Sequence, residues 1–164
     1  MNAAAENRLS ILFADVVGST QLYENLGDER ARETVQQCLR VMKQATENFG
    51  GSVIKTMGDE VMSTFPSADD ALNAANQMQQ RITNSMRVDA QGTHVAIRIG
   101  CHYGPVQLEE RDISGVAVHT ANSMTSQAKA GQILITSAVV DQLSPQWKGL
   151  VRQIDVATPK GQSD

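Results

Sequence analysis

The stretch LSILFADVVGST, residues 9–20, sets the beginning of the fold. Residues 9–17 are a short run of mostly apolar side chains, which predicts a buried β-strand. One charged residue, Asp15, interrupts this run near its end. The following residues 18–20, Gly-Ser-Thr, predict a tight turn that leads directly into a helix.

A long helix and a hairpin are predicted after this turn. Apolar side chains recur at steps of three and four, which places them on one helical face, and Gly50-Gly51 ends the helix. Residues 52–56, SVIKT, and 60–65, EVMSTF, predict two strands joined by a tight turn at residues 57–59. The apolar face of the helix consists of Val35, Cys38, Met42, Ala45 and Phe49.

A second helix and a long strand are predicted next. Pro66-Ser67 begins the helix, whose apolar face is small enough to lie close to a sheet. Residues 84–92 are polar and predict a loop, and residues 93–103, THVAIRIGCHY, alternate as a strand. We expect Gly104-Pro105 to break this strand before VQL resumes it at residues 106–108. The helical face consists of Ala68, Ala71, Ala75, Met78 and Ile82.

The last third of the chain predicts shorter elements. Residues 109–115, EERDISG, are expected to form a loop, followed by a helix over residues 117–128 that Gly131 closes. The remaining predictions are a strand at residues 132–136, a short helix at 137–143 and a final strand at 147–156.

This order of elements predicts an α+β fold. We expect an α/β sandwich with a mostly antiparallel sheet, helices packed on it, and a ferredoxin-like βαββαβ core. The length fits one domain, and the sequence contains neither an internal repeat nor a linker. We therefore predict a single domain over residues 1–164.

The composition excludes several classes of protein. With 41% hydrophobic and 20% charged residues, the chain is neither disordered nor fibrous. Six aromatic residues and a net charge of −4 provide neither base-stacking platforms nor a basic stripe. We therefore expect no nucleic-acid partner and no direct membrane contact. A nucleotide is not excluded, because metal ions and backbone amides can hold it.

The two cysteines bear on the location of the protein. Cys38 and Cys101 each lie in an apolar pattern without a second cysteine nearby, so we interpret them as buried free thiols of a reducing compartment. No apolar run is long enough to span a membrane, and residues 1–8 lack the hydrophobic part of a signal peptide. The expected location is the cytoplasm.

Two carboxylates and one turn are the candidate functional groups of this sequence. Asp15 ends a buried strand and Asp59 lies at a hairpin turn, where a carboxylate is costly unless it is paired or binds a cation. Adjacent strands can bring both together, and carboxylate oxygens suit Mg²⁺ or Mn²⁺. The turn at residues 18–20 opens a helix whose free N–H groups favour a phosphate. The alternative is that Asp15 only caps the helix and Asp59 only fills a turn.

Four motifs together resemble a known family. They are FADVVGST (13–20), GGSVIKTMGDEVMSTF (50–65), IRIGCHYGPV (97–106), and DISGVAVHTANSM with AKAGQILIT (112–136). In this order the chain, from about residue 8 to 161, resembles the class III nucleotidyl cyclase catalytic domain. The resemblance implies the sandwich fold and the conversion of ATP or GTP into a 3′,5′-cyclic nucleotide and pyrophosphate. It also implies sites formed between two domains.

The resemblance assigns metal and phosphate contacts by position. Asp15, Asp59 and the backbone carbonyl of Val16 match ligands of two Mg²⁺ or Mn²⁺ ions about 4 Å apart, which activate the ribose 3′-hydroxyl. For Arg98, the alternative is an ordinary strand arginine in a salt bridge. The residues matched to phosphate contacts are Gly18, Ser19, Thr20, Arg98 and Lys160.

The resemblance also assigns the purine contacts. Lys55 and Asp112 match the pair that reads the base, and a lysine and an aspartate complement the N1 acceptor and N6 donor of adenine. This pair resembles that of an adenylate cyclase. The alternative is a solvent-facing Lys55 beside an ordinary loop Asp112.

Two positions depart from the family pattern. His119 stands where the family has an asparagine, and Ser123 where it has an arginine, both of which stabilise the transition state. Loss of one such donor typically lowers the rate by about 10²–10³. The family also continues past the end of this chain with another strand, so we expect the chain to be part of a longer protein and to lack the final strand.

These observations favour an adenylate cyclase domain that converts ATP to 3′,5′-cyclic AMP and pyrophosphate in a head-to-tail homodimer or heterodimer, with weak activity. One alternative is an inactive nucleotide-binding or regulatory module. Another is the metal-bearing half of a heterodimeric cyclase. In the dimer, one chain supplies Asp15, Asp59 and Arg98, and its partner supplies Lys55, Asp112, His119 and Ser123.

Overall fold

Strands and helices follow one another in the predicted α+β order. The computed structural model describes residues 7–85, 95–110 and 112–153. Its strands are β1 (Asn7–Val17), β2 (Ser52–Met57), β3 (Glu60–Phe65), β4 (Ala96–Glu109), β5 (Asp112–Ser114) and β6 (Ile133–Ile135). Its helices are α1 (Ser19–Leu26), α2 (Asp28–Asn48), α3 (Ala68–Ser85), α4 (Val116–Gln127), α5 (Ser137–Gln142) and α6 (Pro145–Lys148).

The sheet has β1 at its centre. Its strand order is β2-β3-β1-β4-β5, with β6 beside β4, and every neighbouring pair is antiparallel except β4 and β6. The run from β1 to β4 therefore has the order of a ferredoxin-like βαββαβ unit, as predicted. The central position of β1 places its residues between two neighbouring strands.

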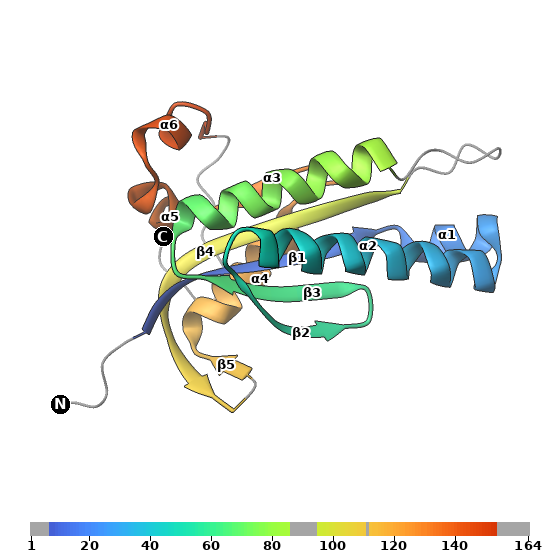
Figure 1. Ribbon diagram of the computed structural model, residues 1–164, viewed down its shortest axis with the longest axis horizontal. Helices are drawn as coiled ribbons and strands as arrows, with labels where there is room; N and C mark the ends of the chain where they lie inside the picture. Colours follow the sequence, from blue (N-terminus) through green and yellow to red (C-terminus); the bar gives the residue numbers. More distant parts are fainter. Residues whose placement is uncertain (1–6, 86–94, 111, 154–164) are drawn as a thin grey trace.

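Helices cover both faces of the sheet. Helices α2 and α3 lie side by side on one face, and α4 packs on the other against β1 and β4 (Figure 1). Side chains along β1 alternate between these faces, so Leu12, Ala14 and Val16 join the core under α2 and α3. Ile11 and Phe13 join the smaller core under α4.

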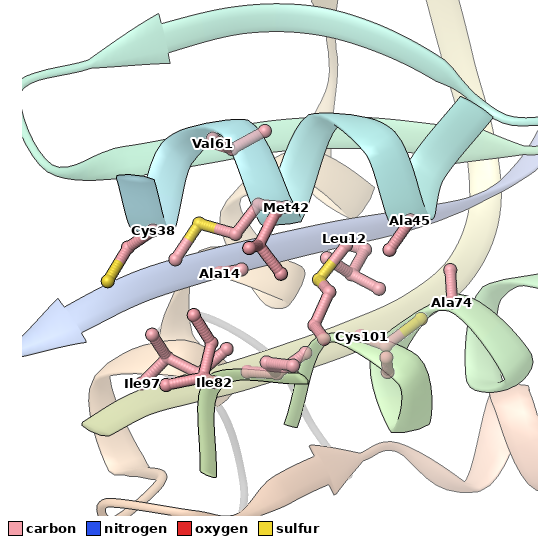
Figure 2. Close-up of a cluster of buried hydrophobic side chains, with 14 of the residues drawn as sticks. Leu12, Ala14, Cys38, Met42, Ala45, Val61, Ala74, Ile82, Ile97 and Cys101 are labelled. Carbon is pink, nitrogen blue, oxygen red and sulfur yellow. The ribbon is translucent and has the colours of Figure 1, made fainter. Parts of the chain in front are cut away.

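The predicted helical faces form the larger core. Every predicted face residue of α3 is buried, and so are those of α2 except Phe49, which is partly buried. Figure 2 shows Cys38, Met42 and Ala45 of α2 above Leu12 and Ala14 of β1. The stripe of small side chains on α3 lets this helix lie close to the sheet, as the sequence predicts.

Helix α4 approaches β4 closely at one residue. A Cβ atom on Gly100 would lie 2.2 Å from the backbone nitrogen of Thr125. The Thr125 hydroxyl donates to the carbonyl of Ala121, 3.1 Å away, within the helix. Only glycine at position 100 lets the C-terminal half of α4 lie directly on the sheet.

Two predictions around β4 are wrong. Gly104-Pro105 does not break the strand, because at Pro105 only β1 pairs with β4 and no ladder forms on the other side among the described residues. The predicted loop at residues 109–115 contains strand β5, whose Asp112 pairs with Glu109 of β4. A three-residue strand that depends on this pairing has no clear local sequence pattern.

The C-terminal prediction is also wrong where the structure describes it. Residues 147–153 contain no strand, and Trp147 lies in α6. Ser144 accepts a hydrogen bond from the Trp147 N–H and Pro145 occupies the first helical turn, which together favour a helix start. The Trp147 indole also donates to Asn73 of α3, 3.1 Å away. The predicted loop at 84–92 lies mainly outside the described residues, and so does the end of the predicted strand.

Both cysteines are free and buried, as predicted. Burial raises the pKa of Cys38 to about 11 and that of Cys101 to about 12, so both thiols are protonated at neutral pH. Within residues 7–85, 95–110 and 112–153, no helix is long and apolar enough to cross a membrane.

Candidate active site

Strand pairing brings the two predicted carboxylates together at one end of β1. Asp15 lies opposite Glu60 of β3, and the backbone N–H of Val16 donates to the carbonyl of Asp59, 3.1 Å away. The Asp15 side chain is only 16% exposed. Burial, and then a hydrogen bond and charge repulsion from Asp59, raise the pKa of Asp15 to about 6. The two carboxyl groups therefore share one small acidic site.

Arg98 occupies the other side of Asp15. It lies directly opposite Asp15 on β4, and its Nη2 and Nε atoms donate to the same carboxylate oxygen, Oδ2, at 3.1 and 3.2 Å. Its Nη1 atom donates to the backbone carbonyl of Ser126 in α4, 3.3 Å away. The salt-bridge interpretation of Arg98 is thus correct for the chain alone, and one arginine connects the acidic site to α4.

Glu60 is a third acidic residue that the sequence analysis did not single out. Burial, and then the charges of Asp15 and Asp59, raise the pKa of Glu60 to about 7. The hairpin turn sets Glu60 opposite Met57, whereas the pairing of β1 with β3 sets it opposite Asp15 and has no local sequence signal.

The turn between β1 and α1 has the backbone expected of an anion cradle. Gly18 adopts a left-handed conformation with φ of 69°, which glycine tolerates best. No side chain caps the first turn of α1. Its N–H groups and the positive end of the helix dipole therefore favour a phosphate. Ser19 is half-buried and Thr20 exposed.

Lys55 and Asp112 form an ion pair that joins the two ends of the strand order. Lys55 Nζ on β2 lies 3.1 Å from Asp112 Oδ2 on β5, and their side chains are 41% and 37% exposed. The backbone N–H of Ile113 donates to Asp112 Oδ1 at 2.8 Å. This N–H, and then Lys55, lower the pKa of Asp112. Lys55 is therefore not merely solvent-facing, and both side chains remain accessible.

The two positions that depart from the family pattern lie on the outer side of α4. His119 is exposed and Ser123 is half-buried, one helical turn apart, whereas the inner side of the helix packs on the sheet. Lys160 lies outside the described residues.

One chain keeps the predicted site residues in separate groups. Asp15, Asp59 and Arg98 meet beside β1, and Lys55 meets Asp112 across the sheet edges. No hydrogen bond or ion pair between described residues joins these two groups.

Comparison with known proteins identifies the family. The family model described as "Adenylate and Guanylate cyclase catalytic domain" matches residues 1–162. The chain belongs to this family. The cyclase domain is 31% identical over 138 residues to an adenylate cyclase of Streptomyces coelicolor, which covers 84% of the chain and 35% of that protein. An adenylate cyclase of Anabaena cylindrica is 30% identical over 173 residues, covering 94% of the chain and 34% of that protein.

Solved structures of cyclases have the same fold. The adenylyl cyclase CyaB from P. aeruginosa matches with a TM-score of 0.81 at 25% identity, covering 96% of the chain and 89% of that structure. An adenylate/guanylate cyclase/hydrolase from Silicibacter pomeroyi matches with a TM-score of 0.79 at 25% identity, covering 95% and 91%. The cyclase domain itself spans about a third of the length of the curated relatives it matches.

The acidic site fits a divalent cation as a pair of ligands rather than as a complete cage. Cyclases of this class generally depend on divalent cations, and the carboxylate oxygens of Asp15 and Asp59 are hard donors that suit Mg²⁺ or Mn²⁺. Within the described part of the chain, no group of three or more His, Cys, Asp or Glu side chains is arranged to hold a metal. A cation held by these two carboxylates would take its other ligands from backbone oxygen, water or phosphate.

Proposed function

We propose that this cyclase domain converts ATP to 3′,5′-cyclic AMP and pyrophosphate. The observation that carries the proposal is the Asp15–Asp59 carboxyl pair, held beside Arg98 and next to the uncapped turn at Gly18. These groups form a site for a cation and a phosphate chain on adjacent elements. The relatives named adenylate cyclase support the same reaction.

Each group of the site has a separate role in this reaction. Two Mg²⁺ or Mn²⁺ ions, when bound, supply activation of the ribose 3′-hydroxyl and neutralisation of the phosphate charge. Asp15, Asp59 and the Val16 carbonyl hold them. The backbone N–H groups of residues 18–20 bind phosphate oxygens, and Arg98 donates to the phosphates as well. In the full chain, Lys160 is proposed as a further phosphate contact.

Lys55 and Asp112 are proposed to read the adenine base. The lysine donates to N1 and the aspartate accepts from the N6 amino group. Their exposed ion pair supports this role, because it holds both side chains close together while leaving them accessible. An ion pair this exposed contributes little to stability, so the base can separate the two charges at small cost.

The site is proposed to form in a head-to-tail dimer. One chain holds the metal and phosphate groups apart from the purine pair, and a second copy with twofold symmetry would complement both groups at once. Each dimer then contains two sites, with Asp15, Asp59 and Arg98 from one chain and the purine pair from the other. Exposed Leu108 near the end of β4 and exposed Val116 at the start of α4 supply apolar surface for this contact.

The proposed activity is weak. His119 and Ser123 occupy the positions that carry asparagine and arginine in the family, and a serine has no charge to place against the transferring phosphate. His119 is exposed on α4 and so is accessible to a second chain. Its imidazole can donate a hydrogen bond, and this supports a slow reaction rather than none.

The direct test is an assay of the purified chain with ATP and Mn²⁺. We expect slow formation of 3′,5′-cyclic AMP that an Asp15→Ala variant abolishes, and slower or no product from GTP. Thr34→Ala, on α2, serves as the matched control and should leave the rate unchanged. Product no greater than that of Asp15→Ala would contradict the proposal and favour an inactive nucleotide-binding module.

A second candidate function follows from Ser123. With no guanidinium at that position, the chain can serve as the metal-bearing half of a heterodimeric cyclase. Mixing it with a homologous domain that carries the asparagine and arginine but lacks both metal aspartates tests this function. Cyclic AMP from the mixture, and from neither chain alone, would favour the heterodimer over the homodimer.

We also propose a cytoplasmic location. The two free, buried thiols support a reducing compartment.

A further inference from the structure

The Asp15–Arg98 contact is concentrated on one carboxylate oxygen. Nε and Nη2 of Arg98 both donate to one oxygen, Oδ2 of Asp15, at 3.2 and 3.1 Å. A carboxylate oxygen offers about two lone pairs in the plane of the carboxyl group. Arg98 therefore fills the hydrogen-bonding capacity of the oxygen that it contacts.

The same guanidinium is the counter-charge of a strongly acidic surrounding. Asp15 is 16% exposed and is flanked by Asp59 and Glu60, whose charges act on it or on each other. Arg98 is 33% exposed and is the cation that acts on both Asp15 and Glu60. The described chain thus meets the need for a positive charge at Asp15 with one of its own side chains.

We propose that Arg98 acts as an internal substitute for a metal ion. In the metal-free chain its guanidinium occupies Asp15 Oδ2 and competes with divalent cations for this oxygen. This inference rests on the proposed function, since it takes Asp15 to be a metal ligand. Because Arg98 donates twice to Oδ2, a cation that took this oxygen as a ligand would have to displace the guanidinium.

Arg98 has a defined place to remain when it leaves Asp15. Its Nη1 atom donates to the Ser126 carbonyl in α4, 3.3 Å away, and this contact does not involve the carboxylate. The side chain therefore keeps one anchor while its other donors become free for an anion such as a phosphate. Metal and phosphate binding are then positively coupled through one arginine.

Calorimetric titration of the full chain with MnCl₂ alone, without nucleotide, tests the proposal. We expect Arg98→Gln to bind Mn²⁺ about fivefold more tightly or better, which is the lower end of common coupling between two ligands. Arg81→Gln is the matched control, because Arg81 also loses a hydrogen bond, to Gln44 at 2.8 Å, but lies on α3. It should bind Mn²⁺ as the wild type does.

Arg98→Lys separates occupation of the oxygen from the effect of a nearby charge. Lysine keeps the charge but cannot place two N–H groups of a rigid fork on Oδ2. We expect an Mn²⁺ affinity between those of wild type and Arg98→Gln. An affinity equal to that of the wild type would overturn the proposal. If Arg98→Gln does not fold, Arg98→Lys alone tests the competition.

The outcomes distinguish this inference from the proposed function. If Asp15→Asn abolishes Mn²⁺ binding but the Arg98 variants bind as the wild type does, only the competition is wrong. Weaker binding by Arg98→Gln would likewise overturn it. If Asp15→Asn binds Mn²⁺ as the wild type does, Asp15 is not a ligand, and both the metal assignment and this inference are wrong.

Discussion

Burial and charge repulsion both raise the pKa values of acidic residues at the candidate site. Asp15, with a pKa of about 6, and Glu60, with a pKa of about 7, both bind protons more tightly in the folded chain than in the unfolded chain. Carboxyl groups with raised pKa values are common where a protein prepares a site for a cation or for proton transfer. Burial first, and then the neighbouring charges, therefore disfavour the ionised carboxylates at this point of the fold.

The acidic site predicts how stability depends on pH without metal. Because Glu60 binds its proton more tightly when folded, its contribution to stability is complete below its usual pKa of 4.5 and is lost as the pH rises through about 7. In EDTA, we expect the melting temperature of the wild type to fall from pH 5 to pH 8 relative to that of Glu60→Gln. Glutamine mimics the protonated form and does not titrate.

The control for this pH series is Glu47→Gln, which removes an exposed carboxylate at the end of α2. Its melting curve should follow that of the wild type at each pH. Parallel curves for the wild type and Glu60→Gln would show that Glu60 does not titrate in this range.

The two thiols give a second prediction at the scale of single residues. Burial raises the pKa of Cys38 to about 11 and that of Cys101 to about 12, so almost no thiolate is present at pH 8. We expect both thiols to resist a disulfide exchange reagent in the native state and to react fully in denaturant. Rapid reaction of one thiol in the native protein would contradict the burial of that residue.

At the scale of elements, the contact between β4 and α4 is the least tolerant of change. A Cβ on Gly100 would lie 2.2 Å from the Thr125 backbone nitrogen, and backbone does not move aside as a flexible side chain does. We expect Gly100→Ala to lower the free energy of unfolding by about 2 kcal/mol or more, as overpacking does. Urea denaturation measures this change.

Gly149→Ala is the matched control for Gly100. Gly149 has an ordinary helical φ of −71°, and the nearest atoms to an added Cβ lie at 3.7 Å. We expect its unfolding curve to stay close to that of the wild type. Equal stability of the two variants would mean that α4 can shift away from the sheet.

Two residues of helix α4 lead to a prediction about the rate of cyclic AMP formation. His119 and Ser123 lie one turn apart on its outer side, so exchanging both places an amide and a guanidinium on one surface, where Ser123 has no charge to offer. We expect His119→Asn with Ser123→Arg to raise the rate of cyclic AMP formation by about 10²-fold, the usual value of one such donor. A steady-state assay with Mn²⁺ measures it, with Ser137→Ala as a control.

Sequence periodicity predicted the elements that carry their own signal. The small face of α3 and the face of α2 repeat every three to four residues, and the hairpin has a turn at Gly58 between two apolar runs. Strand β5 and the continuity of β4 at Pro105 could not be predicted, because both depend on which strands pair along each stretch of β4. Pairing is a property of the fold rather than of a local segment.

The candidate site was predictable to a similar extent. The sequence indicated that Asp15 and Asp59 converge, and the resemblance paired Lys55 with Asp112, which the structure joins in an ion pair. The contact of Arg98 with the Ser126 carbonyl had no sequence signal, because every residue offers a carbonyl group.

The whole molecule presents two incomplete groups of site residues, and this predicts complementation between variants. Asp59→Asn removes a proposed metal ligand and Lys55→Gln removes a proposed purine contact, so we expect each variant alone to be inactive. Mixing them should restore about a quarter of the unmutated activity, because half of the dimers are mixed and each has one intact site of two. Cyclic AMP is measured over long incubations, since the activity of the unmutated chain is itself expected to be weak.

No recovered activity in the mixture, with dimers confirmed by sedimentation, would mean that each chain builds its site alone. Dilution gives an independent measurement. If two chains share each site, specific activity should fall as the protein concentration drops below the dissociation constant of the dimer.

The ion pair across the ends of the strand order has a consequence for how such domains diverge. Asp15 lies on the central strand, where a change disturbs pairing on both sides. Within the part of the chain that the structure describes, Lys55 and Asp112 lie on strands that pair on one side only. Substitutions at the edges can therefore accumulate with little loss of stability. Under the proposed roles of these residues, a lineage with this architecture is free to change the base that it selects while it keeps the same cation chemistry.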